Sequence, residues 1–439
     1  MVNIRKLTLQ NFLYAILLFS FTCVESSPIY QPQPNENRVI IKAANCSQAD
    51  VQAAINAASN GDIVSVPAGT CTWTSTVNIP GIKGITLQGA GVDATIIKLN
   101  HSGAGIRISA GSGVTYRVTG FTLLALQEGD FGNESTNAMI SIEGTSQESN
   151  WRIDHIKFDD DPDSINPYGV GVSGHTYGLI DHCTFDGIGS AVFVQGGIAD
   201  DPVFFGDISW TRPVDWGGPK AVYIEDCKFT GRIPNQEQVY DGRYGGRIVF
   251  RYNTVLDYWI EPHSGCPNGG RAVLHNEIYE NSFEDTVPGG GGMWMAMRIR
   301  GGTGVIFNNT VKDPDNDRVI LIDNQRSCLS CNGIWSTNPC DGSSPYDGNT
   351  PGYYGWPCMD QIGRGAKQES EPLYAWGNTL NGNPVHIEEF GLCGRETEHH
   401  LVEGRDYYNG VPKPGYTPYV YPHPLATPPF PPEKLRIVR

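Results

Sequence analysis

Ile278-Tyr279-Glu280-Asn281-Ser282-Phe283 is one copy of a six-residue phrase that recurs along the chain. Each copy has an apolar residue, two mostly polar residues, a central pivot (Ile, Cys or Asn), one more polar residue and a second apolar residue. The copies are Ile153–Phe158, Ile180–Phe185, Ile224–Phe229, Phe250–Val255, Ile278–Phe283, Ile306–Val311 and a weaker one, Ala375–Leu380. Their pivots are 27, 44, 26, 28, 28 and 69 residues apart. Self-similarity at a period of about 20–50 residues is typical of solenoids.

The residues within the copies favour strands over helices. They are rich in Val, Ile, Phe and Thr and lack the i, i+3, i+4, i+7 apolar pattern of a helix. A coil of about 26–28 residues with strands about 4.8 Å apart predicts an all-β, single-stranded right-handed parallel β-helix. Asn253, Asn281 and Asn309 hold the pivot in successive copies, where stacked asparagines can form an amide ladder. The alternative is that Asn and Gly mark ordinary turns of a β-sandwich.

The spacing and composition divide the chain into four parts: residues 1–26, 27–42, 43–406 and 407–439. The first is predicted to be a signal peptide, because Arg5 and Lys6 precede an apolar run, Phe12–Phe21, that is too short to span a bilayer. We therefore expect a secreted protein. A lipid anchor at Cys23 is the less favoured alternative, and residues 27–42 form a polar leader.

The third part is predicted to be the β-helix itself. Its first helix, expected over Ser47–Ala58, would cap the open end of the solenoid and cover unpaired strand edges. The long gaps between pivots predict loop insertions near residues 196–219 and 325–370. The Pro- and Tyr-rich tail, Tyr407–Pro432, is expected to form no ladder strands and to lie as an extended strap or a disordered end.

Ten cysteines remain once Cys23 is removed with the signal, an even number that suits an oxidising compartment. Cys46 and Cys71 flank the expected cap helix and could be joined. Cys183 and Cys227 are pivots of adjacent coils and could form either a disulfide or stacked thiols. Four cysteines lie in the large insertion, where disulfides are expected in preference to metal or redox chemistry: Cys328, Cys331, Cys340 and Cys358.

The formal net charge of −16 argues against nucleic acid and anionic membranes as partners. No segment after the predicted signal is long and apolar enough for a transmembrane helix, and a monomer is expected. An acidic substrate would have to be held by a few local cations.

The cap segment Asp62–Gly69, the following Ile85–Gly89 and the repeated pivots together resemble the pectate-lyase-like superfamily of secreted right-handed β-helix proteins. The resemblance covers nearly all of the mature chain and is specific for the fold. It implies a polysaccharide partner, held in a groove beside the first strand of successive coils. It does not choose among lyases, glycoside hydrolases, epimerases, esterases and adhesins.

For one stretch, Met293–Arg300, the sequence predicts which side chains point outward. Period-two alternation predicts that its three methionines and Ile299 point inward, while Trp294, Ala296, Arg298 and Arg300 point outward. Trp stacks on sugar rings, and Arg forms two-pronged bonds to carboxylates. The alternative is a purely structural role, in which the two arginines pair with acidic neighbours and a loop covers the tryptophan.

One coil earlier, Trp259, Glu261 and His263 are predicted on one face, although Pro262 interrupts the strand. Arg271 follows a Gly-Gly pair and would join them if the loops converge. Trp259, Glu261, Arg271 and Trp294 are therefore candidate substrate contacts, and His263, Arg298 and Arg300 are candidate catalytic groups. A lone His or Arg is more often structural, so the prediction rests on convergence.

These residue types suit β-elimination on a uronic-acid polysaccharide. In that reaction the enzyme neutralises a uronate carboxylate and a base removes the adjacent C5 proton. Arg298 and Arg300 would clamp the carboxylate and could also act as the base, with His263 as a second candidate and the chemically easier base. A glycoside hydrolase needs two carboxylates about 5–9.5 Å apart. The densest acidic cluster of the chain consists of Asp159, Asp160, Asp161 and Asp163. It could supply these carboxylates or hold Ca²⁺, but a solvated loop is the favoured interpretation. No other cofactor is indicated, and a non-catalytic glycan-binding adhesin is the third alternative.

Overall fold

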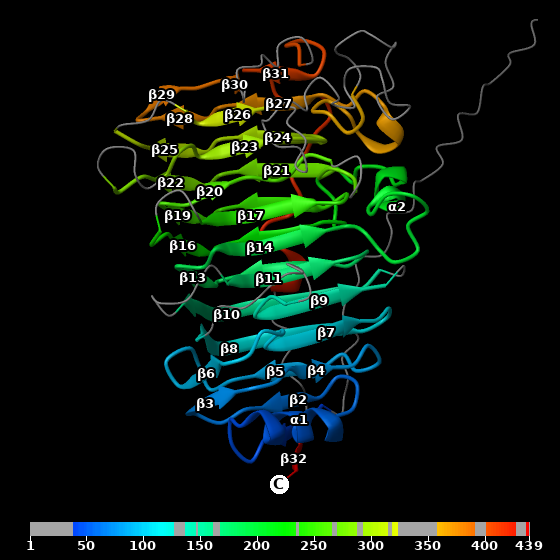
Figure 1. Cartoon of the computed structure of the whole chain (residues 1–439), viewed down its shortest axis with the longest axis vertical. Coiled ribbons are helices and arrows are strands. Elements are labelled where there is room, and N and C mark those ends of the chain that lie inside the picture. The colour runs from blue at the N-terminus through cyan, green and yellow to red at the C-terminus, as the bar shows by residue number, and fades with distance from the viewer. Residues whose placement is uncertain are drawn as a thin grey trace, which may run out of the picture. The chain divides into compact units, whose positions relative to one another are not determined.

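Parallel strands of successive coils stack on one another along the chain, with the cap at one end (Figure 1). The computed structural model describes residues 38–126, 137–145, 148–160, 167–233, 237–265, 270–287, 293–314, 318–323, 358–390, 401–426 and 436–438, all within one unit, Asn35–Arg439. The predicted signal peptide, Cys23 and most of the polar leader lie outside the described residues. The fold prediction is confirmed: the chain is a right-handed parallel β-helix.

Most complete coils contribute one strand to a sheet called here sheet B and two strands to a larger sheet, sheet A. Sheet B contains β4 (Val77–Ile79), β7 (Ile106–Ala110), β9 (Ile140–Gly144), β11 (Tyr168–Ser173), β14 (Ser190–Gln195), β17 (Gln238–Arg243), β20 (Trp259–Ile260), β23 (Met297–Ile299), β26 (Ile320–Ile322) and β30 (Ile387–Glu389). All its strand pairs are parallel.

Sheet A is folded along a corner into two strips. The first strip contains β1 (Val39–Lys42), β2 (Ile63–Ser65), β5 (Thr86–Gln88), β12 (Tyr177–Asp181), β15 (Val222–Glu225), β18 (Arg247–Arg251), β21 (His275–Tyr279), β24 (Thr303–Phe307), β27 (Leu373–Trp376) and β31 (Tyr407–Asn409). The second contains β3 (Gly69–Trp73), β6 (Thr95–Leu99), β13 (Thr184–Asp186), β16 (Lys228–Thr230), β19 (Thr254–Leu256), β22 (Ser282–Glu284), β25 (Thr310–Lys312) and β28 (Thr379–Leu380), which pairs antiparallel with β29 (Asn383–Pro384). Two long strands, β8 (Thr115–Ala125) and β10 (Asn150–Asp160), run through both strips.

The repeated phrase forms the corner between the strips. The residue before each pivot has a positive φ, from His155 at 51° to Gly377 at 66°. That left-handed residue turns the chain and leaves backbone groups that the next strand cannot pair. The asparagine pivots satisfy them: Asn253 Nδ2 donates to Asn281 Oδ1 at 3.1 Å, and Asn281 Nδ2 donates to Asn309 Oδ1 at 2.9 Å. The predicted amide ladder is therefore present, and Asn378 extends it by one more rung at 2.9 Å.

The apolar positions of the phrase fill the interior. Phe158 stacks on Phe185 with ring centroids 4.6 Å apart, and Phe185 stacks on Phe229 at 4.9 Å. These stacks repeat at the strand spacing because the parallel register places identical positions above one another. The pivots and apolar positions are thus structural, and chemistry has to come from side chains that point outward.

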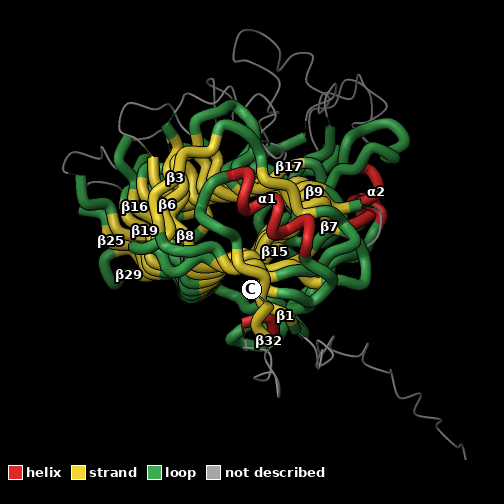
Figure 2. The backbone as a smooth tube through the Cα atoms, turned by 90° about the horizontal axis from the view of Figure 1, so that it is seen from below, coloured by secondary structure: helices red, strands yellow, loops and turns green. Residues whose placement is uncertain are grey.

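The cap helix α1 (Gln48–Ala57) lies across the first coil (Figure 2). Ser47 caps its N-terminus by accepting a bond from the Asp50 N–H at 3.3 Å. Val51, Ala54 and Ile55 are buried. The expected link between Cys46 and Cys71 is present as a disulfide.

The other described cysteines resolve the open alternatives. Cys183 and Cys227 are free, buried thiols, and Cys227 Sγ accepts a bond from the Cys183 N–H at 3.5 Å. Burial, followed by the neighbouring Cys183, raises the pKa of the Cys227 thiol. Cys358 is disulfide-bonded, whereas Cys328, Cys331 and Cys340 lie outside the described residues. The first insertion contains the short helix α2 (Asp207–Thr211), and the second contains η3 (Ala366–Gln368).

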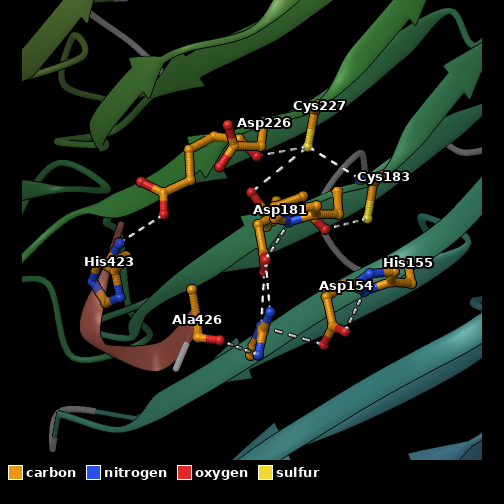
Figure 3. A network of polar contacts seen from close by, with 12 residues as sticks. Asp154, His155, Asp181, Cys183, Asp226, Cys227, His423 and Ala426 are labelled. Carbon is orange, nitrogen blue, oxygen red and sulfur yellow. Dashed lines mark hydrogen bonds and ion pairs between the residues drawn. The ribbon is translucent and has the colours of Figure 1, made fainter. Parts of the chain in front are cut away.

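The tail returns over the outer side of the first strip. Tyr416 donates to Glu277 at 2.6 Å, the carbonyl of Tyr419 accepts from Arg251 at 2.7 Å, and the carbonyl of Ala426 in η4 (Pro424–Ala426) accepts from Arg152 at 3.1 Å. These contacts move from later to earlier coils as the tail proceeds (Figure 3 shows the last of them).

The expectation that Tyr407–Pro432 forms no ladder strands is wrong at its first residues, and a further strand follows this segment. Tyr407–Asn409 forms β31, which pairs with β27, and β32 (Arg436–Val438) pairs with β1 beside the cap. Neither segment contains proline, so each retains the N–H groups that a ladder needs. Among the described residues, no helix combines the length and apolar character that crossing a bilayer requires.

We predict that Asn281→Ala lowers the free energy of unfolding by about 3 kcal/mol, because its removal leaves buried N–H and carbonyl groups without partners. Urea unfolding followed by circular dichroism measures the change. Asn383→Ala, at an exposed position in β29, is the matched control and should change it by less than about 0.5 kcal/mol. Equal effects of the two substitutions would mean that the ladder does not stabilise the corners.

Candidate functional site on the outer face of sheet B

The outer face of sheet B holds most of the residues predicted to form a site. Tyr240 of β17 pairs with Ile260 of β20, which pairs with Met297 of β23, and all three belong to the core. Because side chains alternate along an extended chain, the residue that follows each of them points away from the core. Those residues are Asp241, Glu261 and Arg298.

Arg298 lies between two carboxylates. Its Nη1 is 2.7 Å from Glu261 Oε1, and its Nε is 2.5 Å from Asp323 Oδ2. Arg300 Nη2 lies 3.3 Å from the same oxygen of Glu261. Both arginines are only 5% exposed. Burial, followed by the neighbouring Arg298, lowers the pKa of Arg300 more than Glu261 raises it.

His263 forms the second part of the site. Its N–H donates to the Gly242 carbonyl at 2.8 Å, which holds the residue beside β17 even though Pro262 ends β20. His263 Nδ1 lies 2.5 Å from Asp241 Oδ1, and Arg243 Nη2 lies 3.1 Å from Asp241 Oδ2. The same guanidinium nitrogen is 3.3 Å from His263 Nε2. Three residues from two adjacent coils therefore form one closed network.

This network determines the proton positions on His263. A guanidinium only donates hydrogen bonds, so Nε2 facing Arg243 is the acceptor nitrogen and Nδ1–H donates to Asp241. Burial lowers the pKa of His263, and the positive charges of Arg300 and Arg243 also lower it, against the opposing effect of Asp241. The pKa of Asp241 is itself lowered, because His263 and Arg243 outweigh the effect of burial. At neutral pH the pair is a neutral imidazole beside an ionised carboxylate.

An aromatic group lies beside Arg298. Trp259 and Trp294 meet edge to face with centroids 5.6 Å apart, and Trp294 meets Phe390 in the same way at 5.4 Å. The Arg298 guanidinium carbon is 5.9 Å from the Trp294 ring and 5.3 Å from that of Phe390. Both tryptophans are half-buried. The structure thus brings the predicted sugar platforms next to the predicted arginine.

Arg271 does not join this group through any contact of its guanidinium. Two of its nitrogens bind the carboxylate of Asp360 at 2.6 and 2.8 Å, and a third binds Asp207 at 2.8 Å. It also stacks on Trp210, 4.9 Å from the ring centroid. Arg271 therefore links the two insertions. The Gly-Gly pair before it did not predict its partner Asp360, which lies 89 residues away in the sequence.

Of the acidic cluster, the structure describes Asp159, whose carboxylate is paired with two cations, and Asp160. Asp159 Oδ1 is 2.7 Å from Arg232, and its Oδ2 is 2.7 Å from Lys157. Asp160 is buried, 5% exposed, and its carbonyl accepts a bond from Arg232. Asp161 and Asp163 lie outside the described residues. Two cations already occupy the Asp159 carboxylate, so this residue is a poor Ca²⁺ ligand.

The strand expected over Met293–Arg300 is shorter than predicted. β23 covers only Met297–Ile299, and the chain bends at Trp294 and Ala296. Ala296 therefore joins the core, contrary to the expected alternation, whereas the alternation of the last four residues is correct. The bends end the extended conformation on which period-two counting depends.

Several residues of the site were missed in the sequence. Asp241 and Arg243 alternate with the inward Tyr240 in the stretch Gln238–Arg243, so the same counting would have found them. Asp323 and Phe390 follow β26 and β30, one and two coils after β23. No motif marks them, and they become neighbours only through the register.

The likeness to solved structures concerns the fold. An alginate lyase from Paenibacillus sp. str. FPU-7 has a TM-score of 0.46 and 12% identity over 82% of this chain and 99% of that chain. The mannuronan C-5 epimerase AlgE4 A-module of Azotobacter vinelandii has a TM-score of 0.35 and 12% identity over 85% and 96%. The catalytic domain of a GH87 alpha-1,3-glucanase has a TM-score of 0.34 and 11% identity over 88% and 70%. No protein-family model and no curated protein matches the sequence. At these sequence identities and TM-scores, the similarities support no inference about the activity of this protein.

We predict that His263 titrates at a lower pH than a histidine of the unfolded chain, whose ordinary pKa is 6.5. Because the unfolded chain binds more protons at this residue, the group contributes a loss of folding stability as the pH falls below about 6.5. The imidazole resonance, assigned by its absence in His263→Gln, measures the titration by NMR. Asp241→Asn should lower the pKa further, since it removes the one favourable charge. A midpoint above 6.5 would refute the assigned network.

Proposed function

We propose that this protein is a secreted carbohydrate-active enzyme that cleaves a uronic-acid polysaccharide by β-elimination on the outer face of sheet B. The observation that carries the proposal is a partly buried, neutral His263 held by Asp241, with its acceptor nitrogen 3.3 Å from an arginine. A base and a carboxylate-binding cation are thus neighbours. The Cys46–Cys71 disulfide and the predicted signal over residues 1–26 agree with an extracellular substrate.

His263 is the base in this proposal. The lowered pKa keeps Nε2 unprotonated at neutral pH, and Asp241 stabilises the imidazolium that forms when Nε2 accepts a proton. Arg298 and Arg300 were predicted as possible bases, but each guanidinium lies within ion-pair distance of Glu261, and a guanidinium is a far poorer proton acceptor than a neutral imidazole. We therefore assign proton removal to His263 and not to Arg298 or Arg300.

Arg243 and Arg300 are the cations proposed to bind the uronate carboxylate. The Arg243 side chain is 23% exposed, against 6% for Arg300 and Arg298, so Arg243 is the first guanidinium a ligand can reach. When the carboxylate binds Arg243, that guanidinium turns from Nε2 and leaves its lone pair available. Arg298 is already shared by Glu261 and Asp323 and acts as a positioning residue that fixes Glu261.

The bonds balance as follows. Nε2 of His263 takes the C5 proton, and the C5–H electron pair forms the C4=C5 double bond while the C4–O4 bond breaks. Negative charge that develops on the carboxylate is stabilised by Arg243 and Arg300. O4 leaves with the departing sugar and takes a proton from the imidazolium, which restores neutral His263. Trp259 and Trp294 remain candidate platforms for neighbouring sugar rings, with Glu261 as a further hydrogen-bond acceptor.

Hydrolysis is less well supported by the same residues. A glycoside hydrolase requires one carboxyl group that carries a proton. The pKa of Asp241 is lowered by His263 and Arg243, and the carboxyl groups of Glu261 and Asp323 are both bound by Arg298. A non-catalytic adhesin would not need a base held in one tautomer.

We predict that the protein generates unsaturated uronate ends from polygalacturonate or alginate, and that a neutral glucan gives no product. His263→Gln and Arg243→Gln should each lower the rate at least about 100-fold, since a general base contributes about 10²–10⁴-fold. Ultraviolet absorbance of the conjugated product follows the reaction. Arg232→Gln is the matched control, because Arg232 also pairs with aspartates but follows β16, in the second strip of sheet A.

The alternatives give different readings in the same assay. New reducing ends without absorbance would show hydrolysis and contradict elimination. Exchange of the C5 proton with deuterated solvent, without chain cleavage, would support the base but contradict the lyase. Binding with none of these signals would leave the adhesin. Full activity in a folded His263→Gln variant would overturn the proposed site.

A further inference from the structure

We propose that Asp360 is a positioning residue of the site on sheet B. It belongs to the second insertion and acts through other residues, not on the substrate. Its carboxylate and its carbonyl fix the backbone of the three segments that carry Arg243, His263 and Arg300. The role in catalysis rests on the proposed function, whereas the role in fixing these segments can be measured without it.

The Asp360 carboxylate holds the run of backbone that begins at Arg271. Its oxygens accept from Arg271 Nη2 at 2.6 Å and from Arg271 Nε at 2.8 Å. Oδ2 also accepts from the Ala272 N–H at 3.0 Å. The Asp360 side chain is 0% exposed and that of Arg271 is 11% exposed, so water competes little for these bonds. The carboxylate thus fixes both the side chain and the backbone of this run.

The run lies between two segments of the site. The Arg271 carbonyl accepts from the Tyr244 N–H at 2.9 Å, and Tyr244 directly follows Arg243. On the other side, the Val273 N–H donates to the His263 carbonyl at 3.1 Å. One short piece of backbone therefore sets the spacing between the proposed base and the guanidinium beside its Nε2.

The Asp360 carbonyl holds the third segment. It accepts from the N–H of Gly302 at 3.1 Å, two residues after Arg300. The chains pack closely here: a Cβ added to Gly301 would lie 2.9 Å from the Asp360 carbonyl oxygen and 2.7 Å from the Ala272 Cβ. Because of this close packing, a displacement of Asp360 is expected to move the segment that carries Arg300.

Asp360 is itself held in an unfavourable conformation. Its φ is 62°, in the left-handed region that residues with a Cβ rarely adopt. Gln368 stabilises it with two bonds: its Oε1 accepts from the Asp360 N–H at 2.8 Å, and its Nε2 donates to Asp360 Oδ1 at 2.7 Å. Backbone strain of this kind persists only where the surrounding contacts fix it, and it is concentrated at functional sites.

The test compares Asp360→Asn with Asp181→Asn in the full chain. Asp181 is the matched control, because it is also 0% exposed and binds an arginine, Arg152, through two nitrogens, but lies on sheet A. Each arginine keeps a second aspartate, Asp207 for Arg271 and Asp154 for Arg152. Both variants should therefore fold and lose thermal stability, which circular dichroism measures.

The first readout is the NMR titration of His263, which needs no activity. Burial lowers its pKa, and the charges of Arg300 and Arg243 lower it further against the opposing effect of Asp241. In Asp360→Asn the two guanidinium groups are no longer held at a fixed distance, so the midpoint should rise by about 0.5 or more. The second readout is uronate cleavage, whose rate should fall at least about tenfold because the reacting groups are misplaced.

Asp181→Asn should leave both readouts unchanged. Gln368→Asn weakens the support of Asp360 without removing a buried charge, and asparagine tolerates the φ of 62° at that position. It should raise the His263 midpoint by a smaller amount, and it decides the question if Asp360→Asn does not fold.

An unchanged His263 midpoint in the folded Asp360 and Gln368 variants would overturn the proposal. So would an equal rise in Asp181→Asn, which would indicate a general loosening of the solenoid. If the wild type cleaves no uronate, the proposed function is wrong, but the His263 midpoints still decide whether Asp360 positions these segments.

Discussion

The amide ladder at the corner of sheet A is the interaction on which the rest of the structure depends. A left-handed residue turns each coil there, and the turn separates backbone groups that neighbouring strands would otherwise pair. Asn281 illustrates how they are satisfied: its Nδ2 donates to Asn309 Oδ1 and to the carbonyls of Phe250 and Tyr279, while its Oδ1 accepts from the Asn253 N–H. A ladder of this kind tolerates no slip, since every amide must meet the amide one coil away.

Fixed register then determines what can assemble on the outer surface. Asp241, His263 and Arg300 come from three consecutive coils, yet parallel pairing on sheet B places them beside one another. The same rule places His155 over His182 on sheet A. Charges that would be costly alone are paired along the stack: Arg251 is fully buried but binds Glu225 at 2.7 Å and the carbonyls of the returning tail. The solenoid thus converts a sequence period into columns of neighbouring side chains.

The fold could be predicted because its signals are local and repeated. Asn253, Asn281 and Asn309 stand at one place in the phrase, and the ladder follows directly from that place. The site could be predicted only in part. Arg298 and Arg300 were found by alternation, but Ala296 was misplaced because the chain bends before β23. The partner of Arg271 could not be found from the sequence, because Asp360 lies in an insertion whose length no period predicts.

The pairing of β32 with β1 shows the same limit, since it joins the first and last described strands and corresponds to no repeat in the sequence. Residues that act through neighbours from other coils, such as Asp241 on His263, become visible only when the register is known.

The most direct test of the account is a crystal structure of the His263→Gln variant bound to an oligouronate. We expect one uronate carboxylate within hydrogen-bond distance of Arg243 and Arg300, with its C5–H directed at residue 263 and a neighbouring sugar ring against Trp259 or Trp294. An oligosaccharide bound away from the outer face of sheet B, or one whose carboxylates avoid both arginines, would contradict the proposed mechanism.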